Sequence, residues 1–127
     1  MSIPVKIESL EAVLQDFGVG YLLTVGDGRT KVVTVDANLD GGVVRLPASR
    51  GSAANLASNP SATLLFPPPA PRGYALLIDG TAEADGDGID FTPESAVLHR
   101  PASHADGPAA PVSAGDQTDC DNDCRPV

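Results

Sequence analysis

The feature that most constrains the fold of this chain is a series of short apolar segments separated by turn residues. Gly, Asp, Asn or Pro residues bound each segment. Spacing of this kind is typical of antiparallel strands joined by tight connections. The segments predicted as strands span residues 21–25, 31–37, 43–46, 62–66 and 74–84.

The connections and the helical patterns narrow the fold class further. The sequences Gly26-Asp27-Gly28 and Asp40-Gly41-Gly42 are typical of hairpin turns. Residues 7–17 place four apolar side chains on one helical stripe, and Gly18 follows as a natural stop. Only one other short helix, rich in Ala, is predicted. Strands at short spacing with two short helices predict a mainly β (α+β) fold, either a small barrel or a sandwich.

The C-terminal part has a different composition from the rest of the chain. Residues 101–127 contain Ala, Pro, Ser, Gly and Asp with almost no large apolar residue, so they cannot form a core of their own. The length of 127 residues is that of one domain. We therefore expect a folded domain over residues 1–100 and an irregular tail over residues 101–127.

The charge of the chain excludes several classes of partner. The formal net charge is −9, and the eight basic residues are spread singly without a basic run. Nucleic acids and anionic membrane surfaces attract concentrated positive charge, so neither is an expected partner. No apolar stretch approaches the roughly 20 residues of a membrane span, and the first residues lack the pattern of a signal peptide. We expect a soluble cytoplasmic protein.

The stretch with the most chemical information is RLPASRGSAANLASNPSATLLF, residues 45–66. An apolar strand enters a Ser/Arg/Gly loop, and a short helix and a second apolar strand follow. The first N–H groups of a helix have no internal partner and favour an anion. Arg50 adds a planar cation suited to phosphate. The alternative is an ordinary strand–helix–strand corner in which the serines only cap the helix.

This order of elements, with Asn55-Leu56 and then Asn59-Pro60 before an apolar strand, resembles the FMN-binding split-barrel family. The family includes pyridoxamine-phosphate-oxidase-like proteins and deazaflavin-dependent reductases, and the likeness covers about residues 7–98. It implies a six-stranded antiparallel split β-barrel with Greek-key topology and two short helices. It also implies a homodimer that holds its cofactor in the groove between the subunits.

The resemblance implies an oxidoreductase that binds FMN, or a deazaflavin instead, together with a small-molecule substrate. Ser49, Arg50 and Ser52 are the expected phosphate contacts, and Asn55 is expected to fix the loop. Hydride transfer would take place on the cofactor, with the protein supplying binding, orientation and shielding from water. No side chain has to act as an acid or base, so we predict no catalytic residue.

The ring system of the cofactor is expected along the strand that lines the groove in similar proteins. Thr34 and the neighbouring backbone at Val33 and Val35 would lie beside it. The true oxidase ends in an Arg/His-containing segment that this sequence lacks, so oxidation of pyridoxamine phosphate is not expected.

This chain departs from the family pattern at one place. Family members usually carry Lys or Arg between the polar loop and the Asn-Leu pair, where residues 51–54 read Gly-Ser-Ala-Ala here. Arg50 is the remaining cation of that segment. A second hypothesis is therefore a split barrel that binds no cofactor and serves as a small-molecule binding or interaction module.

Two further motifs have both a metal-binding and a plainer interpretation. Residues 83–94 have nearly the spacing of a calcium loop, but a solvated hairpin with its turn at 85–88 is favoured. Cys120 and Cys124, with His99 and His104, could form a zinc site through the tail. A local disulfide or two free thiols are the alternatives, and we predict no metal-binding residue.

Overall fold

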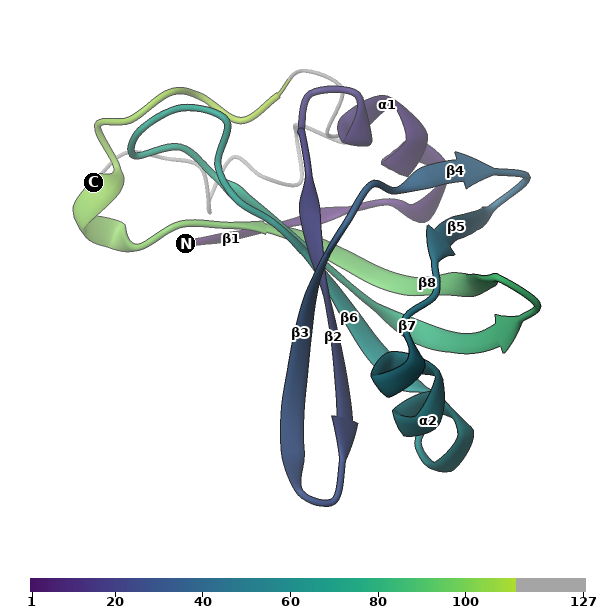
Figure 1. Ribbon diagram of the computed structural model, residues 1–127. Coiled ribbons are helices and arrows are strands. Elements are labelled where there is room, and N and C mark those ends of the chain that lie inside the picture. The colour runs from purple at the N-terminus through teal and green to yellow at the C-terminus, as the bar shows by residue number, and fades with distance from the viewer. Residues whose placement is uncertain (112–127) are drawn as a thin grey trace.

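Antiparallel strands make up about half of the structure, a computed structural model that describes residues 1–111 (Figure 1). Eight strands form one sheet in the order β3-β2-β6-β7-β8-β5-β4, and β1 pairs with β8. All pairings are antiparallel. The strands are β1 (Ser2–Val5), β2 (Gly20–Gly26), β3 (Arg29–Val35), β4 (Asn38–Asp40), β5 (Val43–Pro47), β6 (Ser61–Phe66), β7 (Ala75–Asp85) and β8 (Gly88–His99).

The mainly β fold with two helices is confirmed, but the predicted number of six strands is wrong. The sequence patterns did not predict the two short strands β1 and β4, for different reasons. β1 has only four residues and contains Pro4, which cannot donate to a ladder. β4 is the three-residue segment Asn-Leu-Asp, which is too short and polar for an apolar pattern. β3 and β4 lie at the two ends of the strand order, and no pairing within residues 1–111 joins them into a closed barrel.

Two of the tight turns have the backbone that the sequence predicted. Asp27 and Gly28 have φ of 53° and 74°, and Gly41 and Gly42 have φ of 61° and 84°. Positive φ at both central residues defines the type I′ turn, whose twist matches that of the flanking strands. Gly26 therefore pairs with Arg29 across the first turn. Both predicted hairpins are confirmed.

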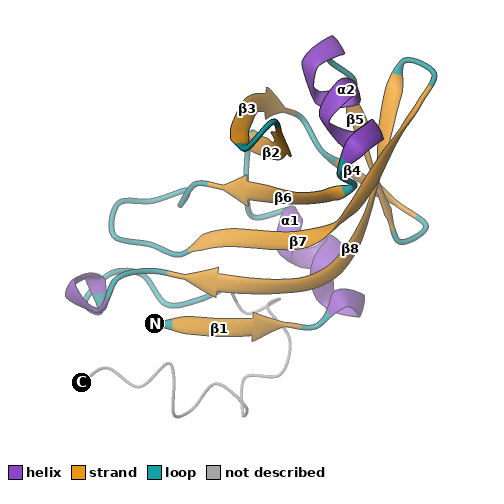
Figure 2. Ribbon diagram, turned by 90° about the horizontal axis from the view of Figure 1, so that it is seen from below, coloured by secondary structure: helices purple, strands orange, loops and turns teal. Residues whose placement is uncertain are grey.

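The helices occupy opposite parts of the sheet. A 3-10 turn, η1 (Ile7–Ser9), leads into α1 (Leu10–Leu14), whose Leu10 and Val13 are fully buried. The apolar stripe is therefore confirmed, but the helix ends before the predicted stop at Gly18. α2 (Arg50–Ser58) lies between the β2–β3 hairpin and the β7–β8 hairpin (Figures 1 and 2).

The core is built mainly from aliphatic side chains, as the low aromatic content requires. Alternate residues of β2, β6, β7 and β8 point to the interior. The rings of Phe17 and Phe66 meet edge to face, with centroids 6.4 Å apart. The largest fully buried side chains are Phe66, Phe91, Ile3, Leu10, Leu22, Leu64, Leu76, Ile78, Ile89 and Leu98.

The first residues of the expected tail pack against the domain. A 3-10 turn, η2 (Ala102–His104), follows β8, and Arg72 binds Asp106 through Nε at 2.7 Å. Ala110 packs against the core. The boundary at residue 100 stays a prediction, and Cys120 and Cys124 lie outside the described residues. No helix in the described part of the chain has the length and apolar character to cross a membrane.

Candidate functional site

The corner before α2 begins with a capped helix end. Ser49 has extended backbone angles and is the N-cap residue, and its Oγ accepts a hydrogen bond from the backbone N–H of Ser52 at 3.2 Å. The Oγ of Ser49 also donates to the Oγ of Ser52 at 2.9 Å, and Ser52 is fully buried. Both predicted serines therefore stabilise the helix start. The N–H groups of Arg50 and Gly51 belong to the same first turn, where a helix leaves donors without partners.

The structure brings a second cation to this corner. Lys31 of β3 lies across the first turn of α2, because a Cβ added to Gly51 would be only 2.6 Å from Lys31 Cε and 3.0 Å from Nζ. The absence of a side chain at Gly51 thus makes room for the lysine. Strand pairing fixes this arrangement, since Lys31 lies opposite Thr24 of β2, which is fully buried.

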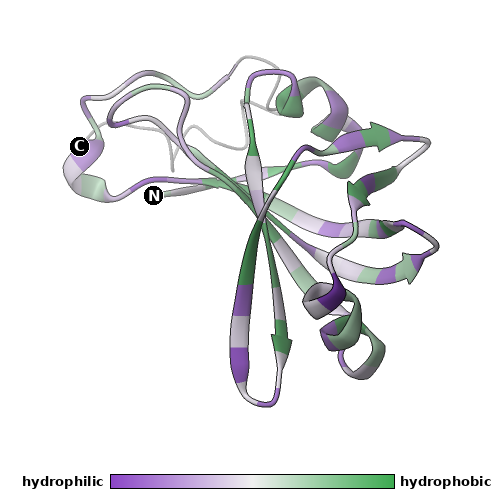
Figure 3. Cartoon of the chain, in the orientation of Figure 1, coloured by the Kyte–Doolittle hydropathy of each residue, from purple (hydrophilic) through white to green (hydrophobic). Residues whose placement is uncertain are grey.

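The two cations of the corner are free of carboxylate partners within residues 1–111. Arg50 is exposed and Lys31 is half-buried, and neither forms an ion pair there. By contrast, Arg45 pairs with Asp90 and lies 3.8 Å from Asp85. A helix N-terminus with two unneutralised cations favours a bound anion. Figure 3 shows the matching pattern, with hydrophilic colour at the start of α2 and on the lower half of β3.

Asn55 fixes the corner from the inner face of α2. Its Nδ2 donates to the Oγ1 of Thr24 at 3.1 Å, which ties the helix to β2. Position 26 of β2 faces the side-chain amide of Asn55 and requires glycine, since a Cβ there would overlap the Oδ1 of Asn55. These contacts give a physical basis for the predicted role of Asn55 in holding the loop. They are contacts within the protein and involve no ligand.

The predicted ring-binding strand, β3, is an edge strand. Val33 is half-buried and Val35 is buried, and their side chains share a face of the sheet with Lys31. Thr34 is exposed and points to the other face. Because Gly26 and Arg29 flank a two-residue turn, the N–H and C=O groups of Val33 and Val35 point to β2. Those of Thr34 point to the open edge, which pairs with no strand of residues 1–111.

The other candidate sites have plainer structures. The segment 83–94 forms the β7–β8 hairpin, with Asp85 paired to Gly88 across the turn, so the predicted hairpin is confirmed. His99 contacts the Oγ of Ser2 at 3.1 Å. Within residues 1–111 no three His, Cys, Asp or Glu side chains gather as metal ligands. The zinc hypothesis through the tail falls on residues outside that range.

Sequence reasoning missed Lys31 as a site residue. The available signal was the Gly26-Asp27-Gly28 turn, because counting outward from it sets Lys31 opposite Thr24. The register alone does not reveal that α2 packs on that face of the hairpin. This packing depends on contacts of α2 with β2, β3 and β7.

Comparison with known proteins gives relatives over nearly the whole chain. The protein is 36% identical to the uncharacterised protein Mb0449c of Mycobacterium bovis, and the match covers 94% of this chain and 92% of that one. The same values hold for the uncharacterised protein MT0457 of Mycobacterium tuberculosis. No family model matches the sequence.

Solved structures of several named proteins have the same fold. An FAD-binding protein of Mesorhizobium loti has a TM-score of 0.61 at 14% identity, covering 79% of this chain and 99% of that chain. A Clostridium acetobutylicum protein of the pyridoxinephosphate oxidase family has a TM-score of 0.57 at 17% identity, covering 74% of this chain and 87% of its own. An F420 reductase has a TM-score of 0.56 at 21% identity, covering 68% of this chain and 94% of that chain. The chain therefore belongs to the family of the two mycobacterial proteins and has the fold of the pyridoxamine-phosphate-oxidase-like split-barrel proteins.

Proposed function

We propose that this protein binds a flavin-type cofactor, FMN or a deazaflavin, at the corner between β3 and α2 and serves as an oxidoreductase. The observation that carries the proposal is the pair of cations, Lys31 and Arg50, at the N-terminus of α2 without carboxylate partners among residues 1–111. The FAD-binding and F420-reducing proteins that share the fold support the same class of cofactor.

The residues present fit the phosphate of such a cofactor. Arg50 offers a planar fork of donors, and Lys31 supplies the charge that the family pattern expects inside residues 51–54. Gly51 makes room for the Lys31 side chain beside the first turn. Ser49 and Ser52 hold the turn in place through their mutual hydrogen bond, and Asn55 anchors it to β2.

The ring system of the cofactor is proposed to lie along the open edge of β3. The backbone groups of Thr34 on that edge can bind a heterocycle with both donors and acceptors, and the half-buried Val33 offers apolar contact near the corner. The side chain of Val35 is buried in the core. When bound, the cofactor supplies hydride transfer. The chain itself binds the phosphate, orients the ring and excludes water. The proposal places the protein in the cytoplasm, on the sequence grounds given above.

We propose that the protein works as a homodimer through the outer face of β2, β3 and β6. On this face Val32 lies opposite Leu23, and Tyr21 lies opposite Leu65. The side chain of Val32 is 54% exposed. Copies of a chain with a net charge of −9 repel each other, so an uncharged face is the favourable place for contact. The face includes β3, so a second copy bound there would shield the proposed ring site from water.

Titration of the purified protein with FMN and with F420, followed by fluorescence, tests cofactor binding. Lys31→Met and Arg50→Met should each weaken binding by about 1.5–3 kcal/mol, roughly tenfold to a hundredfold in Kd. Lys6→Met, which removes a charge at the N-cap of η1, is the control and should leave Kd within twofold. Absence of binding by both cofactors at micromolar concentration would refute the proposal. A cofactor-free binding module, favoured by the internal hydrogen bonds of Ser49 and Ser52, would then take its place.

Sedimentation velocity tests the dimer separately. Val32→Glu should shift the protein to monomer, because it buries a charge without a partner in the proposed contact. Ile7→Glu is the matched control, since Ile7 is also exposed but lies in η1. A wild-type monomer at all accessible concentrations would contradict the dimer proposal.

A further inference from the structure

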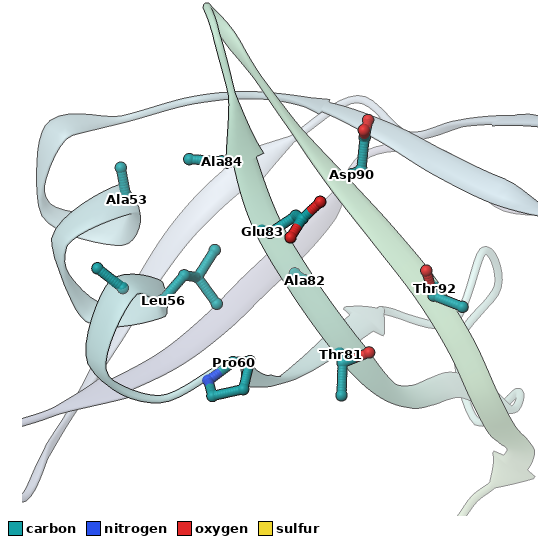
Figure 4. A pocket seen from close by; sticks show the side chains of 10 residues that line it. Ala53, Leu56, Pro60, Thr81, Ala82, Glu83, Ala84, Asp90 and Thr92 are labelled. Atoms are coloured by element: carbon teal, nitrogen blue, oxygen red, sulfur yellow. The ribbon is translucent and has the colours of Figure 1, made fainter.

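A groove of about 680 Å³ lies between α2 and the β7–β8 hairpin, away from the proposed cofactor corner (Figure 4). This volume lies within the range of small-molecule sites. The side chains of α2 that face the groove include Ala53 and Leu56, whereas Gly51 and Asn55 of the same helix face β3 and β2. The groove and the cofactor corner are therefore on different sides of α2.

The groove exists because β6 is shorter than β7. β6 begins with Ser61, which pairs with Thr81, and the N–H of Ala82 donates to Pro60 O at 2.9 Å. Beyond that point no strand of the described residues covers this edge of β7. Backbone N–H and C=O groups of successive residues in a strand point to opposite edges, so those of Ala84 point to the same edge as those of Ala82. The small side chains of α2 leave the space beside this edge unfilled.

The wall of the groove is apolar on the helix side, and the hairpin side carries all of its charged and hydroxyl side chains, next to Ala82 and Ala84. Thr81 of β7 pairs with Thr92 of β8, and two residues further along β7, Glu83 pairs with Asp90. Asp90 is neutralised by Arg45. Glu83 is exposed and forms no ion pair within residues 1–111. No Lys or Arg lines the groove, so its uncompensated charge is negative.

We infer that this groove binds a small amphipathic amine. Its ammonium group would pair with the carboxylate of Glu83 and donate to the hydroxyl groups of Thr81 and Thr92. Its apolar body would lie against Leu56 and the neighbouring alanines. The sign of the charge sets this ligand apart from the anion expected at the other side of α2. The site does not need a bound flavin.

Two-dimensional amide NMR of the ¹⁵N-labelled full chain, with no flavin present, tests the inference. The probes are 2-phenylethylamine and 3-phenylpropionate, which have similar bodies and opposite charges. The amine should give saturable shifts at the amides of Ala53, Ala57 and Ala84, and the acid should give none there. Equal shifts from both probes, or no saturable shift from the amine, would overturn the inference.

Three variants locate the binding. Glu83→Gln should raise the Kd of the amine about threefold to fivefold, the range of one exposed ion pair. Glu8→Gln makes the same change of net charge in η1 and should leave Kd unchanged. Ala57→Leu fills the groove from an exposed position and should abolish the shifts. Binding by Ala57→Leu as in the wild type would overturn the site. The cofactor titration tests the corner between β3 and α2, which lies on a different side of α2 from the groove. The amine proposal and the cofactor proposal can therefore fail independently.

Discussion

Arg100 lies just before the helical turn η2 and Arg50 is the first residue of α2, but their guanidinium groups have opposite surroundings. Arg100 is 4% exposed and lies over the ring of Tyr74 at 4.0 Å from its centroid. Its Nη1 donates to the carbonyl oxygens of Pro108 at 2.6 Å and Arg72 at 3.2 Å. Arg50 is exposed and has no partner within residues 1–111.

This difference separates a cation used by the fold from cations left for a ligand. At the first site, carbonyl groups of two loops surround the guanidinium and join residues 101–108 to the segment before β7. At the second site, Lys31 and Arg50 keep their charges next to a helix start. Stability measurements should therefore respond to the first site, and ligand binding should respond to the second.

The largest expected effect is that of Arg100→Met. This change keeps much of the apolar stem and removes the donors to the carbonyls of Arg72, Ala105 and Pro108. Because these carbonyls lose a charged partner, the free energy of unfolding should fall by about 3 kcal/mol. Urea unfolding followed by circular dichroism measures it. Arg50→Met should change the free energy of unfolding by less than about 0.5 kcal/mol, the range of surface substitutions. Equal losses in both variants would remove the distinction between the two arginines.

The next effect tests whether the cofactor corner depends on its anchor. Asn55→Ala removes the hydrogen bond to Thr24, which is fully buried. The unfolding free energy should fall by about 1.5 kcal/mol, because the hydroxyl of Thr24 loses its amide partner. Thr24→Val in the same background should cost little more, since the bond is already lost. A fully additive double variant would show that the two side chains act independently.

The sequence predicted the local part of this corner correctly. The Ser-rich loop, the short helix and the two flanking strands follow from signals within a few residues, such as the capping serine and the turn residues. The same reasoning selected Arg50, because it lies within that local segment. The capping alternative predicts the bond from the backbone N–H of Ser52 to the Oγ of Ser49, but not the bond between the two hydroxyl groups.

The sequence did not predict features that depend on contacts between distant segments. Lys31 reaches α2 only because the β2–β3 hairpin and the helix pack on one face. The groove beside Ala84 depends on the unequal lengths of β6 and β7, which apolar patterns do not define to the residue. The burial of Arg100 was not predicted either, because its partners are backbone carbonyls that carry no sequence signal.

A smaller effect is expected from the cap. Ser49→Ala removes the acceptor for the N–H of Ser52 and should lower the free energy of unfolding by about 1 kcal/mol. Ser49→Gly should cost only a few tenths of a kcal/mol, because glycine is itself a tolerated N-cap residue. Thermal or urea unfolding of both variants measures the difference. If Ser49→Ala weakens FMN binding without this loss of stability, the serine is a phosphate contact rather than a cap.

The smallest expected effect concerns the exposed ion pair that joins the C-terminal segment to Arg72. The side-chain hydrogen bond from Arg72, at 2.7 Å from Nε, holds the pKa of Asp106 below its ordinary value. A carboxyl group with a lowered pKa in the folded state stabilises the fold above its unfolded pKa, and this contribution is lost as the pH falls through the folded value. The advantage of the wild type over Asp106→Asn should thus be constant near neutral pH and decline progressively as the pH falls below about 4. Urea unfolding of both proteins from pH 3 to pH 7 isolates this group, because all other carboxyl groups titrate in both. Added salt should reduce the advantage, since the pair is exposed. An advantage that grows toward low pH would contradict the lowered pKa and leave the buried Arg100 as the main attachment of this segment.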